Sequence, residues 1–169
     1  RDNQGLSEYS IAASATAIYQ GDPVEMLATG TIGVAAAGDT LLLGPLTGVF
    51  YTDASTSKPT WANHLNASNT ATDIVGFVSD DPYERFEVQA DGATAAADVG
   101  LNADIVYAAG SSPDYVSKVE LDTSDQKAAT AQLRIMGISK DPSNNTAGSA
   151  NVNLVVMINE HFLKGTAGI

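Results

Sequence analysis

The chain has 169 residues, and 20 acidic against 8 basic side chains give it a net charge of −12 at pH 7. This length predicts one domain with a substantial core, and the charge argues against binding to nucleic acid or to an anionic membrane surface, because both attract clustered Lys and Arg. The absence of cysteine excludes disulfides and thiolate chemistry, and no apolar stretch approaches the ~20 residues of a transmembrane helix.

The first part of the chain predicts an arm followed by a hairpin. Residues 1–19 are polar or small, and we expect them to form an extended N-terminal arm. The segment 20–23 is a turn, because Pro fixes φ and the preceding Asp caps the turn. Strands are predicted to start at Val24 and at Thr31, joined by a turn at 28–30.

The next apolar stretch, 41–51, is predicted to form a strand. Gly44 and Pro45 lie inside it, and because Pro cannot donate to a ladder we expect an edge strand or a bulge here. Residues 53–73 show no periodicity and predict one long surface loop. Trp61 gives this loop a hydrophobic anchor, which favours an ordered conformation.

The stretch 83–106 carries a clear strand signal and follows a short predicted strand at 74–78. Its first apolar residues alternate with polar ones, which indicates one buried face; the apolar positions are Phe86, Val88 and Ala90. A turn at 91–92 and about one helical turn at 93–97 separate this strand from a second one over 101–106.

The remainder of the chain predicts further strands at 115–121, 132–138 and 152–158. In the last of these, Val155 and Met157 make the second face apolar as well. A strand that is apolar on both faces is expected to be central or to lie at an interface.

Taken together, at least seven strand-length runs and no long amphipathic helix predict an all-β fold. We expect a small β-barrel or sandwich with short helical turns and long loops. Residues 20–163 are expected to form a single domain, and residues 164–169 a flexible C-terminal tail.

Two groups of residues are candidates for metal or acid–base chemistry. The acidic cluster comprises Asp80, Asp81, Asp91, Asp98 and Asp104. It lacks EF-hand spacing, so turn-forming aspartates are preferred over a calcium site. His64 and His161 would form a site only if folding brought them together, and surface or hydrogen-bonded histidines are the simpler interpretation.

Motifs for catalysis are absent from the sequence. There is no Gly-x-Ser-x-Gly elbow, no P-loop and no dinucleotide-binding glycine motif, so we expect no enzyme activity, no cofactor and no resident metal. Aromatic side chains could stack on sugars, although scattered aromatics more often belong to a core and its rim. These residues are Trp61, Tyr83, Phe86, Tyr107 and Tyr115.

Five short phrases stand out together: residues 20–24, 81–82, 86–89, 97–104 and 151–152. These phrases resemble a group of tailed-bacteriophage virion proteins, the head decoration or cement proteins. The resemblance runs from about residue 9 to about residue 168 and includes the Gly-Thr-Ala-Gly ending.

The resemblance implies a β-rich structural protein without catalytic residues, located on the outer surface of a viral head. It would bind the major capsid protein through apolar area and strand addition, and stabilise the shell. We expect the arm 1–19, the loop 53–73 and the tail 159–169 to carry the contacts. The residues expected to make them are Leu6, Tyr9, Ile11, Trp61, Leu65, Phe162 and Leu163. Closed symmetry suggests a homotrimer or a dimer on the lattice.

Two other functions stay open on the sequence. One is a β-rich module of a phage tail or fibre that recognises host surface carbohydrate, for which a concave site with clustered aromatics would be diagnostic. The other is a hydrolase whose site has no recognisable motif.

Overall fold

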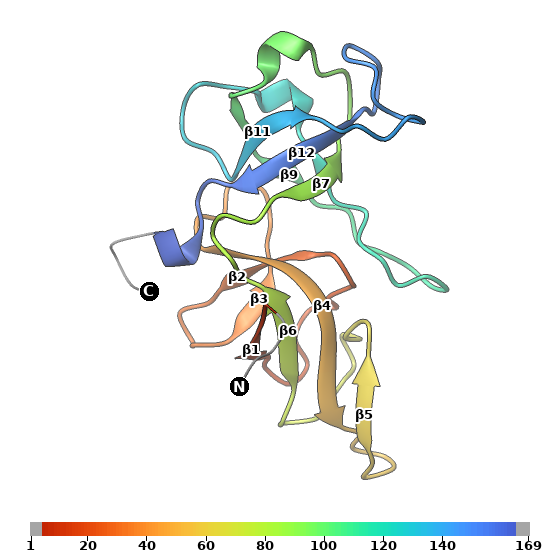
Figure 1. Cartoon of the computed structure of the whole chain (residues 1–169). Helices are drawn as coiled ribbons and strands as arrows, with labels where there is room; N and C mark the ends of the chain where they lie inside the picture. Colours follow the sequence, from red (N-terminus) through yellow and green to blue (C-terminus); the bar gives the residue numbers. More distant parts are fainter. Residues whose placement is uncertain (1–4, 165–169) are drawn as a thin grey trace.

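The computed structural model describes residues 5–164 and consists of two β-rich lobes stacked on each other (Figure 1). The strands are β1 (Leu6–Ser10), β2 (Pro23–Met26), β3 (Ile32–Val34), β4 (Leu42–Thr52), β5 (Pro59–Ala62), β6 (Val75–Ser79), β7 (Phe86–Gln89), β8 (Asn102–Ala103), β9 (Ile105–Val106), β10 (Glu120–Leu121), β11 (Leu133–Ile138) and β12 (Asn153–Ile158). Short 3-10 helices occur at η1 (Ala96–Asp98), η2 (Thr123–Asp125) and η3 (Phe162–Lys164). The predicted all-β fold is confirmed.

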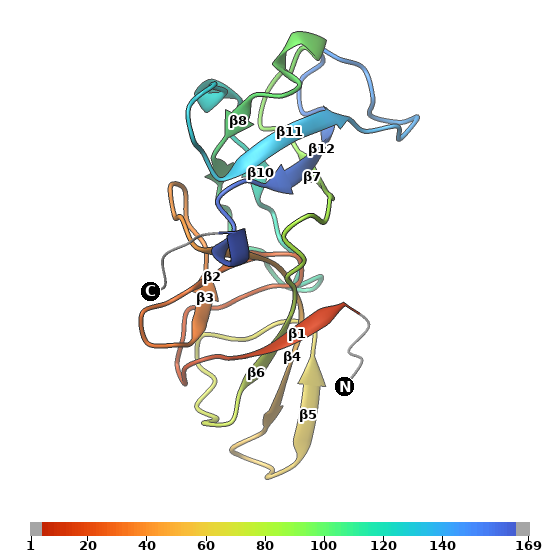
Figure 2. The same ribbon diagram turned by 60° about the vertical axis from the view of Figure 1, so that its left-hand side comes forward.

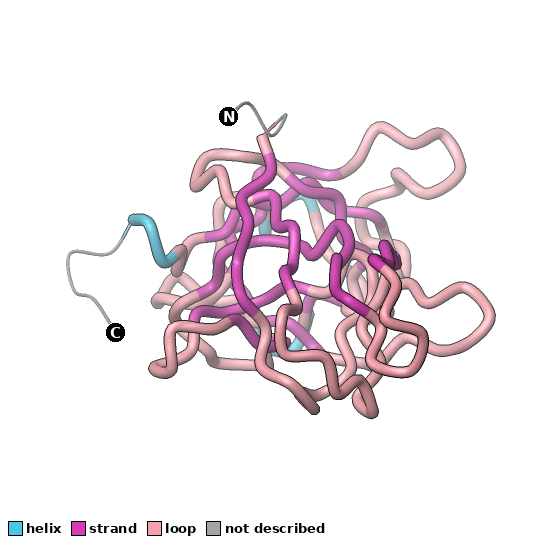
Figure 3. Tube along the Cα trace, turned by 90° about the horizontal axis from the view of Figure 1, so that it is seen from below, coloured by secondary structure: helices cyan, strands magenta, loops and turns pink. Residues whose placement is uncertain are grey.

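The N-terminal lobe is one antiparallel sheet with the strand order β1-β6-β4-β2-β3, and β5 adds to β4. The two ends of this order approach each other at one point, where Ile11, just after β1, forms an isolated bridge with Ile32 of β3, but the described strands do not form a closed barrel. Seen from below, the strands lie around the centre of the molecule and the loops project outside them (Figure 3). The enclosed core consists of Ile11, Ile18, Val24, Ile32, Leu43, Leu46, Val49, Leu65, Ala71, Ile74 and Val78.

Strand β4 is the centre of this lobe, so the edge-strand alternative predicted from Pro45 is wrong and the bulge alternative is right. Pro45 pairs with Pro23 of β2, whereas pairing with β6 begins only at Leu46. Because pairing with β6 has not yet begun at Pro45, the missing N–H of the proline removes no hydrogen bond to β6. The ladder is irregular on both sides of this point, and a Cβ at Gly44 would lie 1.8 Å from the Ser79 carbonyl oxygen.

Two segments predicted as an arm and a loop contribute strands to this sheet. Residues 6–10 of the predicted arm form β1 and pair with β6 along their whole length; residues 1–4 lie outside the described part. The predicted loop 53–73 contains β5, which pairs with the end of β4. Asp53 builds the connecting turn, since one carboxylate oxygen accepts hydrogen bonds from the backbone and hydroxyl groups of Ser55 and Thr56. These bonds lower the pKa of Asp53 to about 2.

The C-terminal lobe contains a sheet of order β7-β12-β11-β8 and the short pair β9-β10. Strand β12 lies between β7 and β11, so the prediction that it is central is confirmed. Alternation in β7 and β11 also places apolar residues inward as predicted. Of the predicted strand 115–121, only β10 is regular. The core comprises Ala35, Leu42, Ala90, Ala103, Ile105, Leu121, Leu133, Ile135, Val152, Leu154, Val156 and Ile158.

Segments that cross between the lobes hold them together. Leu42, the first residue of β4, packs in the C-terminal core, and its N–H donates to the Glu160 carbonyl at 3.2 Å. In the opposite direction, residues 107–119 reach from the C-terminal lobe onto the N-terminal one; we call this segment the strap (Figures 1 and 2). There the Gln20 backbone donates to the Tyr115 carbonyl and accepts from the Ser117 N–H, at 3.2 and 2.8 Å.

Gln132 makes the most specific of these connections. Its side chain is completely buried. The amide nitrogen donates to the carbonyls of Ala36 and Asp39 at 2.7 and 3.0 Å, and the amide oxygen accepts from the Ile105 N–H at 3.0 Å. One side chain thus joins the loop after β3 to β9.

Replacing Gln132 with Leu keeps the volume but removes these hydrogen bonds and leaves the buried Ile105 N–H without its acceptor. We expect the free energy of unfolding in urea to fall by about 1–3 kcal/mol. Gln20→Leu, at an exposed side chain, should change it by less than about 0.5 kcal/mol. Equal losses in the two variants would contradict the role given to Gln132.

Candidate functional site

The outer face of strands β6, β4 and β5 exposes aromatic side chains. Phe50 of β4 pairs with Trp61 of β5 on one side and with Val75 of β6 on the other, so the three residues share one face of the sheet. Phe77 lies two residues from Val75 and therefore belongs to the same face. Trp61 is 56% exposed and Phe50 is 40% exposed. We call Phe50, Trp61, Val75 and Phe77 the aromatic face.

A glycine shapes this face. The Trp61 ring lies 4.8 Å from the Phe77 ring, centroid to centroid, in a tilted arrangement. Between them in the sheet is Gly48, which pairs with Phe77. A Cβ at this position would lie 2.6 Å from the indole, so glycine allows the indole to lie flat on the strand. The result is a large aromatic side chain that is held in place yet remains accessible.

The predicted contact residues are distributed over different surroundings. Leu6 shares the outer side of the sheet with the aromatic face, since it pairs with Ser79, two residues from Phe77. Ile11 and Leu65 are 3% and 1% exposed and form part of the core, so they offer no surface to a partner. Their apolar character serves folding, because Ile11 bridges to Ile32 and Leu65 to Ile18.

The remaining predicted residues lie at the inner side of the sheet or at the C-terminal segment. Tyr9 packs against the N-terminal core and donates its hydroxyl proton to Asp80 at 2.6 Å; burial, followed by this bond, raises the pKa of Tyr9. Phe162 packs against the same core, whereas Leu163 is 52% exposed. Sequence reasoning missed Phe50 and Phe77, whose exposure depends on strand pairing that no local pattern specifies.

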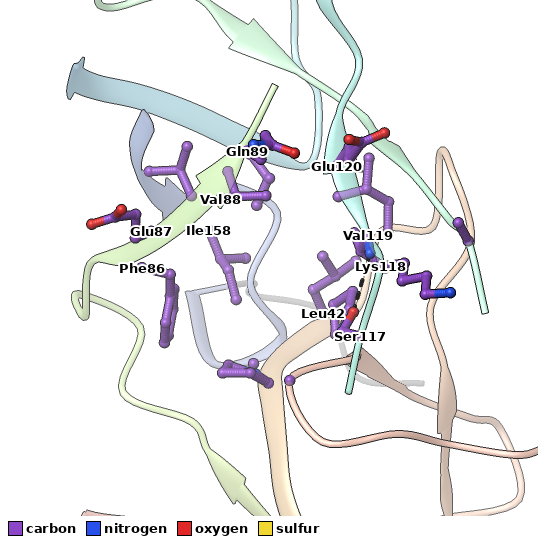
Figure 4. A pocket seen from close by; sticks show the side chains of 18 residues that line it. Leu42, Phe86, Glu87, Val88, Gln89, Ser117, Lys118, Val119, Glu120 and Ile158 are labelled. Atoms are coloured by element: carbon purple, nitrogen blue, oxygen red, sulfur yellow. Dashed lines mark hydrogen bonds between the residues drawn. The ribbon is translucent and has the colours of Figure 1, made fainter. Parts of the chain in front are cut away.

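A second feature is a groove of about 810 Å3 between the two lobes (Figure 4). Phe86 and Val88 of β7 form one wall, and the end of the strap, 117–119, forms the other together with Glu120 of β10; Leu42 and Ile158 contribute to the apolar lining. Asp22 lies beside it, between the lining residues Gly21 and Pro23, and is fully buried. Burial raises the pKa of Asp22, against smaller opposing effects of hydrogen bonds from Ser117 and the Tyr19 backbone.

The two histidines have separate roles. His64 stacks on Tyr115 of the strap with ring centroids 3.8 Å apart and an interplanar angle of 2°, and burial lowers its pKa. His161 is buried, and its Nδ1 accepts a hydrogen bond from the Leu163 N–H at 3.0 Å. Burial is also the main cause that lowers the pKa of His161. Each ring thus supports local packing.

The acidic residues considered as calcium ligands each bind another group of the protein. Asp81 and Asp98 accept backbone N–H groups in turns, and Asp91 accepts the backbone and hydroxyl groups of the distant Thr123. Asp80 accepts the hydroxyls of Ser7 and Tyr9, and Asp104 binds Lys127 and the Gln132 N–H. Among residues 5–164, no group of three or more His, Asp or Glu side chains is placed to hold a metal ion.

Comparison of the chain with protein-family models, curated proteins and solved structures finds no match. Within the described part of the chain, none of the helices has the length and apolar character needed to span a membrane.

His161 makes stability depend on pH. Its pKa in the folded state lies below the ordinary 6.5, so below about pH 6.5 the unfolded chain binds a proton that the native state does not. The neutral His161 side chain therefore contributes its full share to the free energy of unfolding above this pH, and the contribution decreases on acidification. Asn at position 161 can still accept from Leu163 but cannot titrate.

We therefore expect His161→Asn to be less stable than the parent near pH 7.5, and the difference in the free energy of unfolding to shrink toward pH 5.5. Urea unfolding at both pH values measures it. His64→Asn, at a more exposed ring, should show a smaller change. A difference that is constant with pH would exclude the titration of His161 as its cause.

The fit of Trp61 over Gly48 can be tested by fluorescence, since Trp61 is the only tryptophan in the chain. Gly48→Ala should move the indole away from Phe77 and increase its quenching by acrylamide, with little change in the melting temperature. Gly137→Ala, where an added Cβ meets nothing within 4 Å, is the control. Unchanged quenching in Gly48→Ala would show that the indole is not held on the strand.

Proposed function

We propose that this chain is a structural, non-catalytic protein that binds the outer surface of a tailed-phage capsid, contacts the major capsid protein and stabilises the shell. The observation that carries the proposal is the aromatic face. Exposed Trp and Phe side chains on a rigid sheet are the groups that dominate binding energy at protein interfaces. The choice of partner rests on the resemblance of five sequence phrases to head decoration proteins.

The charge of the chain supports an external location. At −12 the protein would be repelled by packaged DNA, whereas an acidic exterior keeps unbound copies soluble. Its candidate acids are engaged in turns and in contacts within the fold, which agrees with a structural role.

The carbohydrate-binding alternative has less support from the geometry. Sugar recognition is favoured by aromatic side chains that converge with polar groups in a concave site. Here the exposed Phe50 and Trp61 lie on an open sheet face, while Phe86 is the one aromatic among the residues that line the interlobe groove. The concave feature and the aromatic cluster are separate.

Trp61→Ala tests the proposal on viral heads from which this protein has been removed. If Trp61 anchors the contact, the substitution should weaken rebinding by about 2 kcal/mol, roughly 30-fold, and leave the melting temperature of the free protein nearly unchanged. Rebinding is measured by co-sedimentation, and shell strength by DNA release on heating.

Tyr83→Ala is the matched control, because Tyr83 is exposed but lies outside the aromatic face. Electron microscopy of gold-labelled protein on whole virions locates the binding site. Label on the tail tip would replace the proposal with the adsorption function, and normal rebinding of Trp61→Ala would remove the aromatic face from the contact.

A further inference from the structure

The outer face of the C-terminal sheet carries apolar side chains of β12 and β11 among polar ones such as Glu87 and Arg134. In β12, Leu154, Val156 and Ile158 point into the core, whereas Val155 and Met157 point to the outside and are half-buried. Its position between β7 and β11 satisfies the backbone of β12 but does not cover these outward side chains. An antiparallel sheet that faces water normally carries polar residues there, so this face has the character of a contact surface.

A hollow of about 540 Å3 lies on this face. Its floor contains Val155 of β12 and Met136 of β11, at the point where the pairing of β11 with β12 is shifted between Ile135 and Gly137. A Cβ built on Gly137 would meet no atom within 4 Å. The chain itself therefore leaves the space above Gly137 open.

The acidic side chains around the hollow have hydrogen-bond partners within the described part of the chain, whereas the basic ones do not. Of its two acids, Glu87 accepts from the Asn153 amide at 3.0 Å, and Asp141 accepts from the Ser143 backbone and hydroxyl groups at 2.9 and 2.8 Å. The two cations, Arg85 and Lys140, form no ion pair or hydrogen bond with any described residue, although the chain carries an excess of acids. The hollow thus combines an apolar floor with two acids that already accept hydrogen bonds and two cations without a partner among the described residues, and these cations can receive a carboxylate that lies beside an apolar side chain.

The strap presents such a segment. Its tip, 111–114, is exposed, and Asp114 has no side-chain hydrogen bond within the described chain, while Val116 is 46% exposed. The strap projects from the body of the molecule (Figure 1). Backbone hydrogen bonds to Gln20 and the stacking of Tyr115 on His64 hold the strap next to its tip. The strap therefore loses little conformational entropy when it docks.

We propose that the hollow lined by Arg85, Met136, Lys140 and Val155 binds the strap tip of a second copy of this chain. Asp114 of one copy pairs with the two cations of the next, and Val116 covers the apolar floor. Because hollow and strap are different surfaces, the contact is head-to-tail, which can build a ring or an open filament; the ring is the form proposed. This self-association does not require the capsid.

Sedimentation velocity and native mass spectrometry over a range of concentrations test the proposal. The unmodified chain should form a closed oligomer. Gly137→Ile fills the hollow with a strand-favouring side chain, so its melting temperature should be unchanged or higher while the dissociation constant rises at least about tenfold. Lys140→Glu should weaken the oligomer to a similar degree.

Lys58→Glu makes the same charge change at a different exposed loop and should leave the oligomer intact. Lys140→Asp combined with Asp114→Lys should restore association that each single change weakens. A monomer at every concentration, or an oligomer that is unaffected by Gly137→Ile and Lys140→Glu, would overturn the proposal. Because no capsid is present, these outcomes are independent of the capsid-binding experiment.

Discussion

The relative position of the two lobes depends on a buried amide. Apolar contacts, such as that of Leu42 with the C-terminal core, favour association but tolerate sliding, whereas the Gln132 side chain has three directional partners. Any shift of one lobe would leave at least one of these groups without a partner. The largest cost would come from the buried Ile105 N–H, which would lose its acceptor. These hydrogen bonds help to set the relative positions of the groove, the strap and both outer sheet faces.

The strands that sequence analysis predicted well are those with a local signal. Alternation in 86–90, 133–135 and 152–158 has a period of two, and burial follows it; beyond Ile135 the register shift in β11 interrupts the alternation. What the pattern could not supply was pairing. Residues 6–10 and β5 became strands because β6 and β4 offered edges to them, and Ile11 and Leu65 became core because distant segments closed over them. For the same reason Trp61 could be singled out from the sequence, but its neighbours on the aromatic face could not.

The acidity of the chain has a structural origin that its composition conceals. Asp53, Asp81, Asp122 and Asp141 each accept the backbone N–H of the residue two positions later, and Asp22, Asp39 and Asp98 each accept that of the residue three positions earlier. A β fold with long connections has many such turns, and Asp stabilises them. Much of the negative charge therefore follows from loop construction and needs neither a metal ion nor a cationic substrate to explain it.

The aromatic face and the hollow lie on different lobes, and this separation has a consequence for assembly. Under the two proposals, a copy that contacts a shell through its aromatic face keeps its hollow free for a neighbour, although its own strap tip lies against the N-terminal lobe, where Asn63 donates to the Asp114 carbonyl at 3.5 Å. Each contact then raises the effective concentration for the other, and modest individual affinities give persistent occupancy. This coupling works only if the lobes do not move relative to each other, since a flexible junction would lower that effective concentration. Under these proposals the buried amide of Gln132 would serve binding as well as folding.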